Sequence, residues 1–255
     1  MVRVELLGSG NAFLPSGRHH SFLCIDRHMI VDVPPTALAS LRRAGISPSE
    51  IDTILITHTH GDHVFGFPFL LLERKYISDR EEENSLTVAS SPGVRQRLEH
   101  LCHLAYPGSL ESMFEKINWV DIPTLKEWNF ERFRVKHDPE VDPHGWMLTH
   151  KSGFSLLHSG DSGPCDELWT RVEKCEFAIV EMGVPQWVPT EFHHKPNDIQ
   201  KLAEKCPNTT ILVTHTFIDA DYKIVTTQLP DFPENVIHGN DEMRFEVSKD
   251  SVQML

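Results

Sequence analysis

Residues 54–63 read Ile54-Leu55-Ile56-Thr57-His58-Thr59-His60-Gly61-Asp62-His63, and they place three histidines and a carboxylate directly after an apolar run. A run that is apolar at consecutive positions indicates a strand buried on both faces. The polar residues then lie in the loop at the carboxyl end of that strand, where open α/β sheets place their ligand sites. This stretch therefore predicts both an α/β fold and the position of a site.

The side chains of this loop suit a divalent metal ion. Imidazole and carboxylate groups without thiolate are typical ligands of catalytic zinc. We expect His58 and His60 to face one metal ion, and Asp62 and His63 to face a second. Gly61 gives the backbone the freedom that such a tight turn requires. The alternative, a solubilising surface loop, does not explain why the pattern directly follows a hydrophobic strand.

The pattern His-x-His-x-Asp-His after a strand resembles the metal-binding motif of the metallo-β-lactamase superfamily. The segment Gly8-Ser9-Gly10 after a first strand and Asp32 after a third strand are also similar to that superfamily. The resemblance implies the αββα sandwich, an α/β fold in which two mixed β-sheets are flanked by helices. It also implies three further ligands at strand ends: a third histidine, a bridging aspartate and a final histidine.

Three later strands end in candidates for these ligands. An alternating strand leads to His137, which we favour as the third histidine over His144, a residue that stands just before the next strand. The following apolar strand leads to Asp161 in a Ser-Gly-Asp segment, and a carboxylate has two oxygens with which to bridge two metal ions. Residues 210–214 form an apolar strand that leads to His215.

The resemblance implies a binuclear centre that holds two divalent ions, with zinc as the expected metal and manganese as the alternative. We assign the first ion to His58, His60, His137 and Asp161, and the second to Asp62, His63, Asp161 and His215. Two metal ions about 3.5–4 Å apart can activate water and neutralise the charge that develops during its attack. The predicted reaction is metal-assisted hydrolysis.

A further acid–base pair resembles the phosphodiester-cleaving branch of the superfamily, which includes tRNase Z. Residues 176–180 form a strand that ends in Glu181, and His193 precedes a predicted helix. The resemblance implies that Glu181 orients a histidine able to protonate a departing alkoxide. His194 is the alternative for that histidine, and a capping or surface role is the alternative for both. The predicted catalytic residues are Asp62, which is also a metal ligand, Glu181 and His193.

The composition disfavours a large nucleic acid as substrate. The chain has 24 basic and 37 acidic residues and a formal net charge of −13, which repels a polyanion that binds through its phosphates. Two bound dications would reverse the sign locally, so a small nucleotide anion can still enter the site. The tRNase Z family inserts a long Gly/Pro-rich arm between the third histidine and the bridging aspartate, whereas Asp161 follows His137 by only 24 residues.

This compact, acidic and armless form resembles the cyclic nucleotide phosphodiesterases of the superfamily, including the anti-Pycsar enzymes that open cyclic pyrimidine mononucleotides. The resemblance implies hydrolysis of a 3′,5′-cyclic nucleotide to a nucleoside 5′-monophosphate, with His193 protonating the ribose O3′. A tRNA 3′-processing endonuclease, a lactonase and a thioesterase are the alternative enzymes. A protein that only sequesters nucleotides is the non-enzymatic alternative, and the intact set of ligand groups argues against it.

Length and composition predict one hydrolase domain over residues 1–255. No apolar run is long enough to span a bilayer, and the amino terminus lacks a signal-peptide pattern. The five scattered cysteines include no Cys-x-x-Cys pair and indicate a reducing compartment. We therefore predict a cytoplasmic protein without a membrane partner. The resemblance also implies a homodimer, and Tyr106 is a candidate for the dimer contact or for a wall of the active site.

Overall fold

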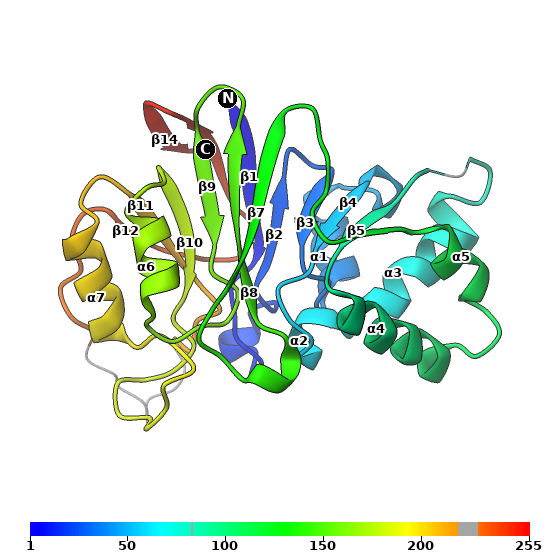
Figure 1. Cartoon of the computed structure of the whole chain (residues 1–255), viewed down its shortest axis with the longest axis horizontal. Coiled ribbons are helices and arrows are strands. Elements are labelled where there is room, and N and C mark those ends of the chain that lie inside the picture. Colours follow the sequence, from blue (N-terminus) through cyan, green and yellow to red (C-terminus); the bar gives the residue numbers. More distant parts are fainter. Residues whose placement is uncertain (83, 219–228) are drawn as a thin grey trace.

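The computed structural model describes residues 1–82, 84–218 and 229–255. Within these residues, two mixed β-sheets lie against each other, and helices cover the outer face of each sheet (Figure 1). The predicted αββα sandwich is therefore confirmed. Among the described residues, no helix is both long enough and apolar enough to cross a membrane.

The first sheet has eight strands among the described residues, in the spatial order β14 (Ser251–Met254), β13 (Met243–Ser248), β1 (Val2–Gly8), β2 (Phe22–Ile25), β3 (Met29–Val31), β4 (Thr53–Leu55), β5 (Thr87–Ala89) and β6 (Asn118–Val120). The second has six, in the order β12 (Val236–His238), β11 (Thr210–Thr214), β10 (Phe177–Glu181), β9 (Ser155–His158), β8 (His144–His150) and β7 (Trp128–Arg134). The helices are α1 (Ala37–Ala44), α2 (Gly61–Val64), α3 (Phe67–Glu73), α4 (Pro92–Ala105), α5 (Glu111–Lys116), α6 (Asp166–Val172) and α7 (Pro196–Lys205).

Three groups of buried apolar side chains hold these layers together. The central group lies between the two sheets and includes Val4 of β1, Trp146 of β8 and Phe177 of β10. A second group packs α1, α3, α4 and α5 on the first sheet, and a third packs α6 and α7 on the second sheet. Strands buried on both faces are apolar at consecutive positions, which explains the sequence of β4 and β10.

The apolar run over residues 64–73 predicts a buried helix, and the structure places α3 (Phe67–Glu73) there, while Val64 is the last residue of α2 (Gly61–Val64). Pro68 has no N–H group with which to continue the helical hydrogen bonds from α2. Gly66 between the two helices lies against the backbone of Pro34, where an added Cβ would be 2.0 Å from the carbonyl oxygen.

The parallel strands of both sheets direct their carboxyl ends toward the same region. Strands β3 and β4 are parallel in the first sheet, and β9, β10 and β11 are parallel in the second. Parallel neighbours bring the loops that follow them to one edge of a sheet. The segments that begin at Asp32, Ile56, Ser159, Glu181 and His215 therefore meet although they are distant in the sequence.

A buried ion pair directly follows α3. Arg74 is fully buried, and its Nε donates to the Asp79 carboxylate at 2.5 Å. The guanidinium also donates to the carbonyl oxygens of Pro48, Ile51 and Asn84. Arg74 thus joins the segment before β4, at Pro48 and Ile51, to the segment that follows it, at Asp79 and Asn84.

Substitution of Arg74 by Met is expected to destabilise the fold by about 3–5 kcal/mol, because Asp79 then remains buried without a counter-charge. Arg80→Met is the matched control, since the Arg80–Glu81 pair is exposed and such pairs contribute about 0–1 kcal/mol. Urea unfolding of both variants measures the difference. Equal stability of the two variants would contradict the structural role of Arg74.

Candidate metal centre

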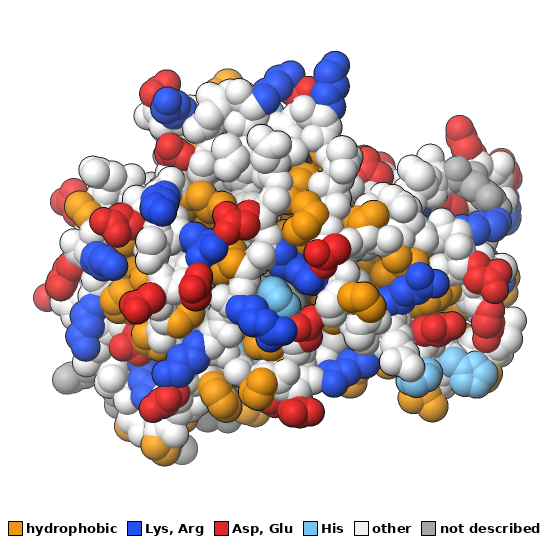
Figure 2. Space-filling model, viewed as in Figure 1, with side chains coloured by type: hydrophobic (Ala, Val, Ile, Leu, Met, Phe, Trp, Pro, Cys, Tyr) orange, Lys and Arg blue, Asp and Glu red, His pale blue; other side chains and the backbone are white. Residues whose placement is uncertain are grey.

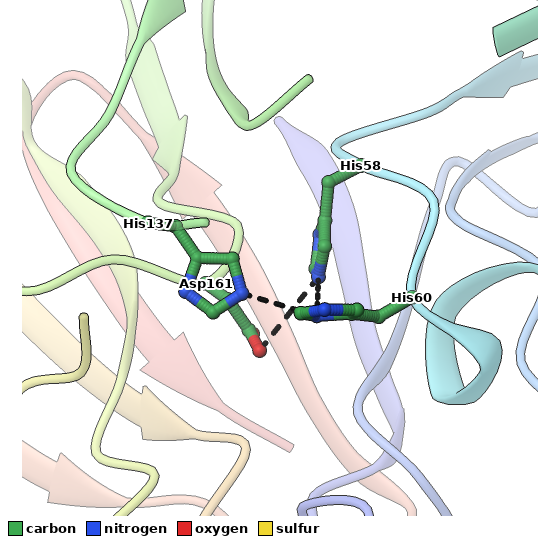
Figure 3. A group of neighbouring side chains, drawn as sticks. All are labelled: His58, His60, His137 and Asp161. Carbon is green, nitrogen blue, oxygen red and sulfur yellow. Dashed lines mark hydrogen bonds and ion pairs between the residues drawn. The ribbon is translucent and has the colours of Figure 1, made fainter. Parts of the chain in front are cut away.

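The first cluster consists of four side chains from three loops: His58, His60, His137 and Asp161. Figure 3 shows the three imidazoles and the carboxylate pointing toward one another. Nδ1 of His60 lies 3.2 Å from Nε2 of His58 and 3.1 Å from Nε2 of His137. Nitrogen ligands at the corners of a zinc tetrahedron are about 3.3 Å apart. The spacing of the three imidazoles therefore suits a shared metal ion.

The second cluster contains Asp62, His63, Asp161 and His215. Nε2 of His215 is 3.2 Å from the Asp62 carboxylate and 3.4 Å from that of Asp161. Nε2 of His63 is 3.3 Å from the other oxygen of Asp161. Asp161 thus belongs to both clusters and presents one carboxylate to two sets of imidazoles, as a bridging ligand requires.

Unpartnered buried atoms test whether these residues fit a metal centre. Nε2 of His63 and Oδ1 of Asp161 are buried and have no hydrogen-bond partner. Leaving such groups unpartnered is costly, because each has lost its water without replacement. Neighbouring His215 and His63 hold the pKa of Asp161 well below its usual value, although burial alone would raise it. An ionised, buried carboxylate that lies among imidazoles, with one oxygen lacking a hydrogen-bond partner, fits two divalent cations.

The two histidines left as alternatives lie elsewhere. His144 begins β8, and its Nδ1 faces the carbonyl oxygen of Asp142 at 2.8 Å rather than a metal cluster. His194 is fully buried, with Nδ1 at 2.5 Å from the Ser162 carbonyl oxygen and Nε2 accepting from Trp169 at 3.0 Å. Both ring nitrogens of His194 are therefore occupied by protein groups.

Residues behind the clusters fix the orientation of the imidazoles. Asp32 accepts hydrogen bonds from the backbone N–H and the hydroxyl of Thr57, both at 2.7 Å, and lies 2.8 Å from Nδ1 of His63. Asp32 itself has a left-handed φ of 63°. Nδ1 of His137 donates to the carbonyl oxygen of Phe192 at 3.0 Å. A partner on the second ring nitrogen sets the tautomer that a metal-binding histidine presents.

The predicted acid–base pair lies beside both clusters. Nδ1 of His193 is 2.8 Å from Oε1 of Glu181, and its ring centroid is 5.0 Å from that of His137 and 6.0 Å from that of His215. Burial alone would lower the pKa of His193, but the Glu181 carboxylate raises it to about 9. The sequence-based expectation that the two residues meet agrees with the structure.

Sequence reasoning missed the part that Gly183 plays in this arrangement. Its N–H donates to Glu181 at 2.5 Å, and a Cβ on Gly183 would lie 2.9 Å from Nδ1 of His193 and 3.1 Å from Nδ1 of His215. The absence of a side chain lets these groups converge. The carbonyl of Gly183 accepts from the buried amide of Asn11 at 3.0 Å, so the loop after β1 runs beside the centre.

The comparisons with known proteins agree with this fold. The metallo-β-lactamase fold protein YhfI of Bacillus subtilis superposes with a TM-score of 0.70 over 95% of this chain and 98% of its own, at 13% sequence identity. The chain is a member of the metallo-β-lactamase superfamily. The family model described as "Anti-Pycsar protein Apyc1" matches residues 2–228. Because the match covers most of the chain, this protein belongs to the anti-Pycsar Apyc1 family.

Two relatives show how far the similarity extends. The Ribonuclease Z of Aeropyrum pernix is 27% identical over 230 residues, which covers 68% of this chain and 71% of that protein. The Anti-Pycsar protein Apyc1 of a Paenibacillus species is 39% identical over 82 residues, which covers 31% of this chain and 34% of that protein. The chain is thus similar both to a Ribonuclease Z and to an anti-Pycsar protein.

Substitution of Asp32 by Asn is expected to weaken metal binding about 10- to 100-fold, because the carboxylate that orients His63 is lost. Asn also tolerates the left-handed backbone at this position. Asp26→Asn is the matched control, since Asp26 also has a positive φ of 49° and accepts from a backbone N–H, that of Arg3. Competition with a fluorescent chelator measures both affinities. Equal affinities in the two variants would refute the orienting role.

Proposed function

We propose that this protein is a binuclear, divalent-metal-dependent phosphodiesterase that hydrolyses a 3′,5′-cyclic nucleotide to a nucleoside 5′-monophosphate. The observation that carries the proposal is the Glu181–His193 pair. The ring of His193 lies next to His137 of the first cluster and next to His215 of the second. Hydrolysis of a phosphodiester requires a proton for the alkoxide that leaves, and this pair can supply it. Membership of the anti-Pycsar family implies degradation of a cyclic nucleotide and supports this choice of substrate.

The two clusters provide the ligands that the reaction needs. The proposed ligands of the first ion are His58, His60, His137 and Asp161, and those of the second are Asp62, His63, Asp161 and His215. When bound, two divalent ions supply an activated water and positive charge that neutralises the phosphate. Zinc is the proposed metal because imidazole and carboxylate ligands suit it, and manganese is the alternative.

The protein's own groups then control the proton. Nδ1 of His193 is bound to Glu181, so Nε2 is the ring nitrogen available to the leaving oxygen. Glu181 is held in turn by the N–H groups of Ser162 and Gly183. The carboxylate therefore keeps His193 in a fixed orientation and favours its protonated form. Asp62, which contacts His215, completes the proposed catalytic set.

The second candidate function is tRNA processing, which similarity to Ribonuclease Z favours. Two features support a small substrate instead. The chain between His137 and Asp161 is filled by a short helical turn, Pro139–Val141, and by β8 and β9, so it carries no long arm for tRNA. Figure 2 shows acidic side chains interspersed with basic ones over the visible face rather than a continuous basic surface.

The location, the oligomeric state, the domain extent and the role of Tyr106 stay predictions. The cytoplasmic location, the homodimer and the single hydrolase domain over residues 1–255 rest on sequence composition and resemblance. Tyr106, a candidate for the dimer contact or for a wall of the site, follows α4 and packs against Phe69 of α3, with ring centroids 5.9 Å apart. This position lies among the helices on the first sheet and supports no role in the candidate site.

The proposed reaction predicts a specific product. Protein loaded with zinc or manganese is expected to convert at least one 3′,5′-cyclic mononucleotide to the 5′-monophosphate, because water would add to phosphorus, the P–O3′ bond would break and His193 would give its proton to O3′. Chromatography of a panel of cyclic nucleotides identifies substrate and product. An inert panel together with cleavage of a precursor tRNA would select the endonuclease instead.

Substitution of His193 by Ala is expected to lower kcat for the cyclic nucleotide about 10²- to 10⁴-fold and to leave the metal content unchanged. The loss should be much smaller for bis(p-nitrophenyl) phosphate, since p-nitrophenolate leaves without a proton. His100→Ala is the control, because His100 is exposed on α4. An equal loss on both substrates, or a loss of metal, would show that His193 is not the general acid.

A further inference from the structure

We propose that the Phe192 ring forms a stacking platform for the nucleobase of the substrate. The inference rests on the proposed function, because it takes the ribose O3′ as the leaving group protonated by His193. It adds a binding site for the part of the substrate that does not react. The chemical class of the ligand is a planar heteroaromatic base attached to a ribose phosphate.

The backbone of Phe192 is held in place by several contacts. Its carbonyl oxygen accepts from Nδ1 of His137 at 3.0 Å, and its N–H donates to the Thr190 hydroxyl at 3.1 Å. The preceding peptide lies directly on Gly163, where an added Cβ would be 1.8 Å from the carbonyl oxygen of Glu191. Glu191 is itself paired with Lys136 at 2.9 Å. The ring is therefore presented from a fixed backbone.

The ring is exposed beside the site despite this fixed backbone. Phe192 is 42% exposed, and its ring centroid is 6.0 Å from that of His137 at an angle of 70°. The His193 ring lies 5.0 Å from the same imidazole. The candidate general acid and the phenyl ring therefore both border one proposed ligand of the first metal ion.

This arrangement matches the shape of a cyclic nucleotide. A ribose whose O3′ faces His193 carries its base away from its own phosphate, and the proposal places that base on the exposed Phe192 ring, which shares the His137 neighbour with His193. Aromatic rings stack on any base, because every base has a π-face. The platform therefore predicts that purine and pyrimidine substrates are both accepted, with affinity gained from the base and little discrimination between bases.

Isolated exposed apolar residues are common on protein surfaces and need no function. Phe65 is a useful comparison, since it is 53% exposed and lies over Gly61 of the metal loop, where a Cβ would be 2.6 Å from its ring. Phe65 directly follows α2, and its ring covers Gly61 at the start of that helix. Phe192 differs from Phe65 because its ring and the ring of His193 both lie next to the imidazole of His137.

Substitution of Phe192 by Ala is expected to lower kcat/KM for the cyclic nucleotide about 5- to 150-fold, the range of a lost base–aromatic stack. The loss should appear mainly in KM. The abasic analogue, methyl ribofuranoside 3′,5′-cyclic phosphate, should be hydrolysed equally by the wild type and the variant. Phe192→Trp should restore turnover of the nucleotide, because an indole also stacks on a base.

Phe69→Ala is the matched control, since Phe69 is 45% exposed and packs on Tyr106 of the helical layer rather than on a proposed ligand. Phe69→Ala should leave kcat/KM unchanged for both the cyclic nucleotide and the abasic analogue. An equal loss on nucleotide and abasic substrate for Phe192→Ala would show that the ring supports His137 rather than the base, and no loss on the nucleotide would also overturn the proposal.

A binding measurement separates this proposal from the proposed function. Titration of the zinc-loaded protein with cytidine 5′-monophosphate and with ribose 5-phosphate compares ligands with and without a base. Phe192→Ala should weaken the binding of cytidine 5′-monophosphate but not that of ribose 5-phosphate. Equally weakened binding of both ligands, or unchanged binding of both, would overturn the platform. A wild-type protein that turns over no cyclic nucleotide would refute the proposed function, while this titration would still decide whether Phe192 binds a base.

Discussion

The burial of Asp161 among imidazoles is the constraint on which the rest of the structure depends. An ionised carboxylate away from water is costly unless cations or hydrogen bonds compensate it. One oxygen of Asp161 has no hydrogen-bond partner, and His58, His63 and His215 lie around the carboxylate. Such an arrangement is stable when positive charge is present at its centre. The surrounding structure holds these groups in a form suited to metal ions.

The two sheets supply different residues to the centre around Asp161. The first sheet supplies the histidine motif after β4 and the orienting Asp32 after β3. The second supplies Asp161, Glu181 and His215 after three parallel strands. The apolar side chains between the sheets fix the position of one sheet relative to the other. A centre built from both sheets therefore depends on packing far from the clusters themselves.

The region of the proposed general acid shows how backbone and side chains act together. Glu181 is fixed by two backbone N–H groups and in turn fixes His193. Gly183 leaves room for these groups, and Asn11 holds the carbonyl of Gly183. Next to this unit, the chain at Phe192 both orients His137 and presents an exposed ring. The same short segment thus connects the metal clusters, the proton donor and the proposed base platform.

The sequence alone determined the chemistry and the strand that carries it. The His58–His63 motif is local, so its residue types and its place after an apolar strand can be read directly. The later candidates His137, Asp161 and His215 could be placed at strand ends for the same reason. The start of α3 only at Phe67, rather than at Val64, was not predicted, because it depends on Pro68 and on the close approach of Gly66 to Pro34.

Only the tertiary structure decided which side chains meet. His215 lies 153 residues from Asp62 and contacts it because two sheets pack together. Neighbouring histidines that look equivalent in the sequence have different surroundings, since His193 faces Glu181 while His194 is enclosed by Ser162 and Trp169. Ring orientation depends on partners supplied by distant segments. A linear pattern contains residue types and spacing, but not those partners.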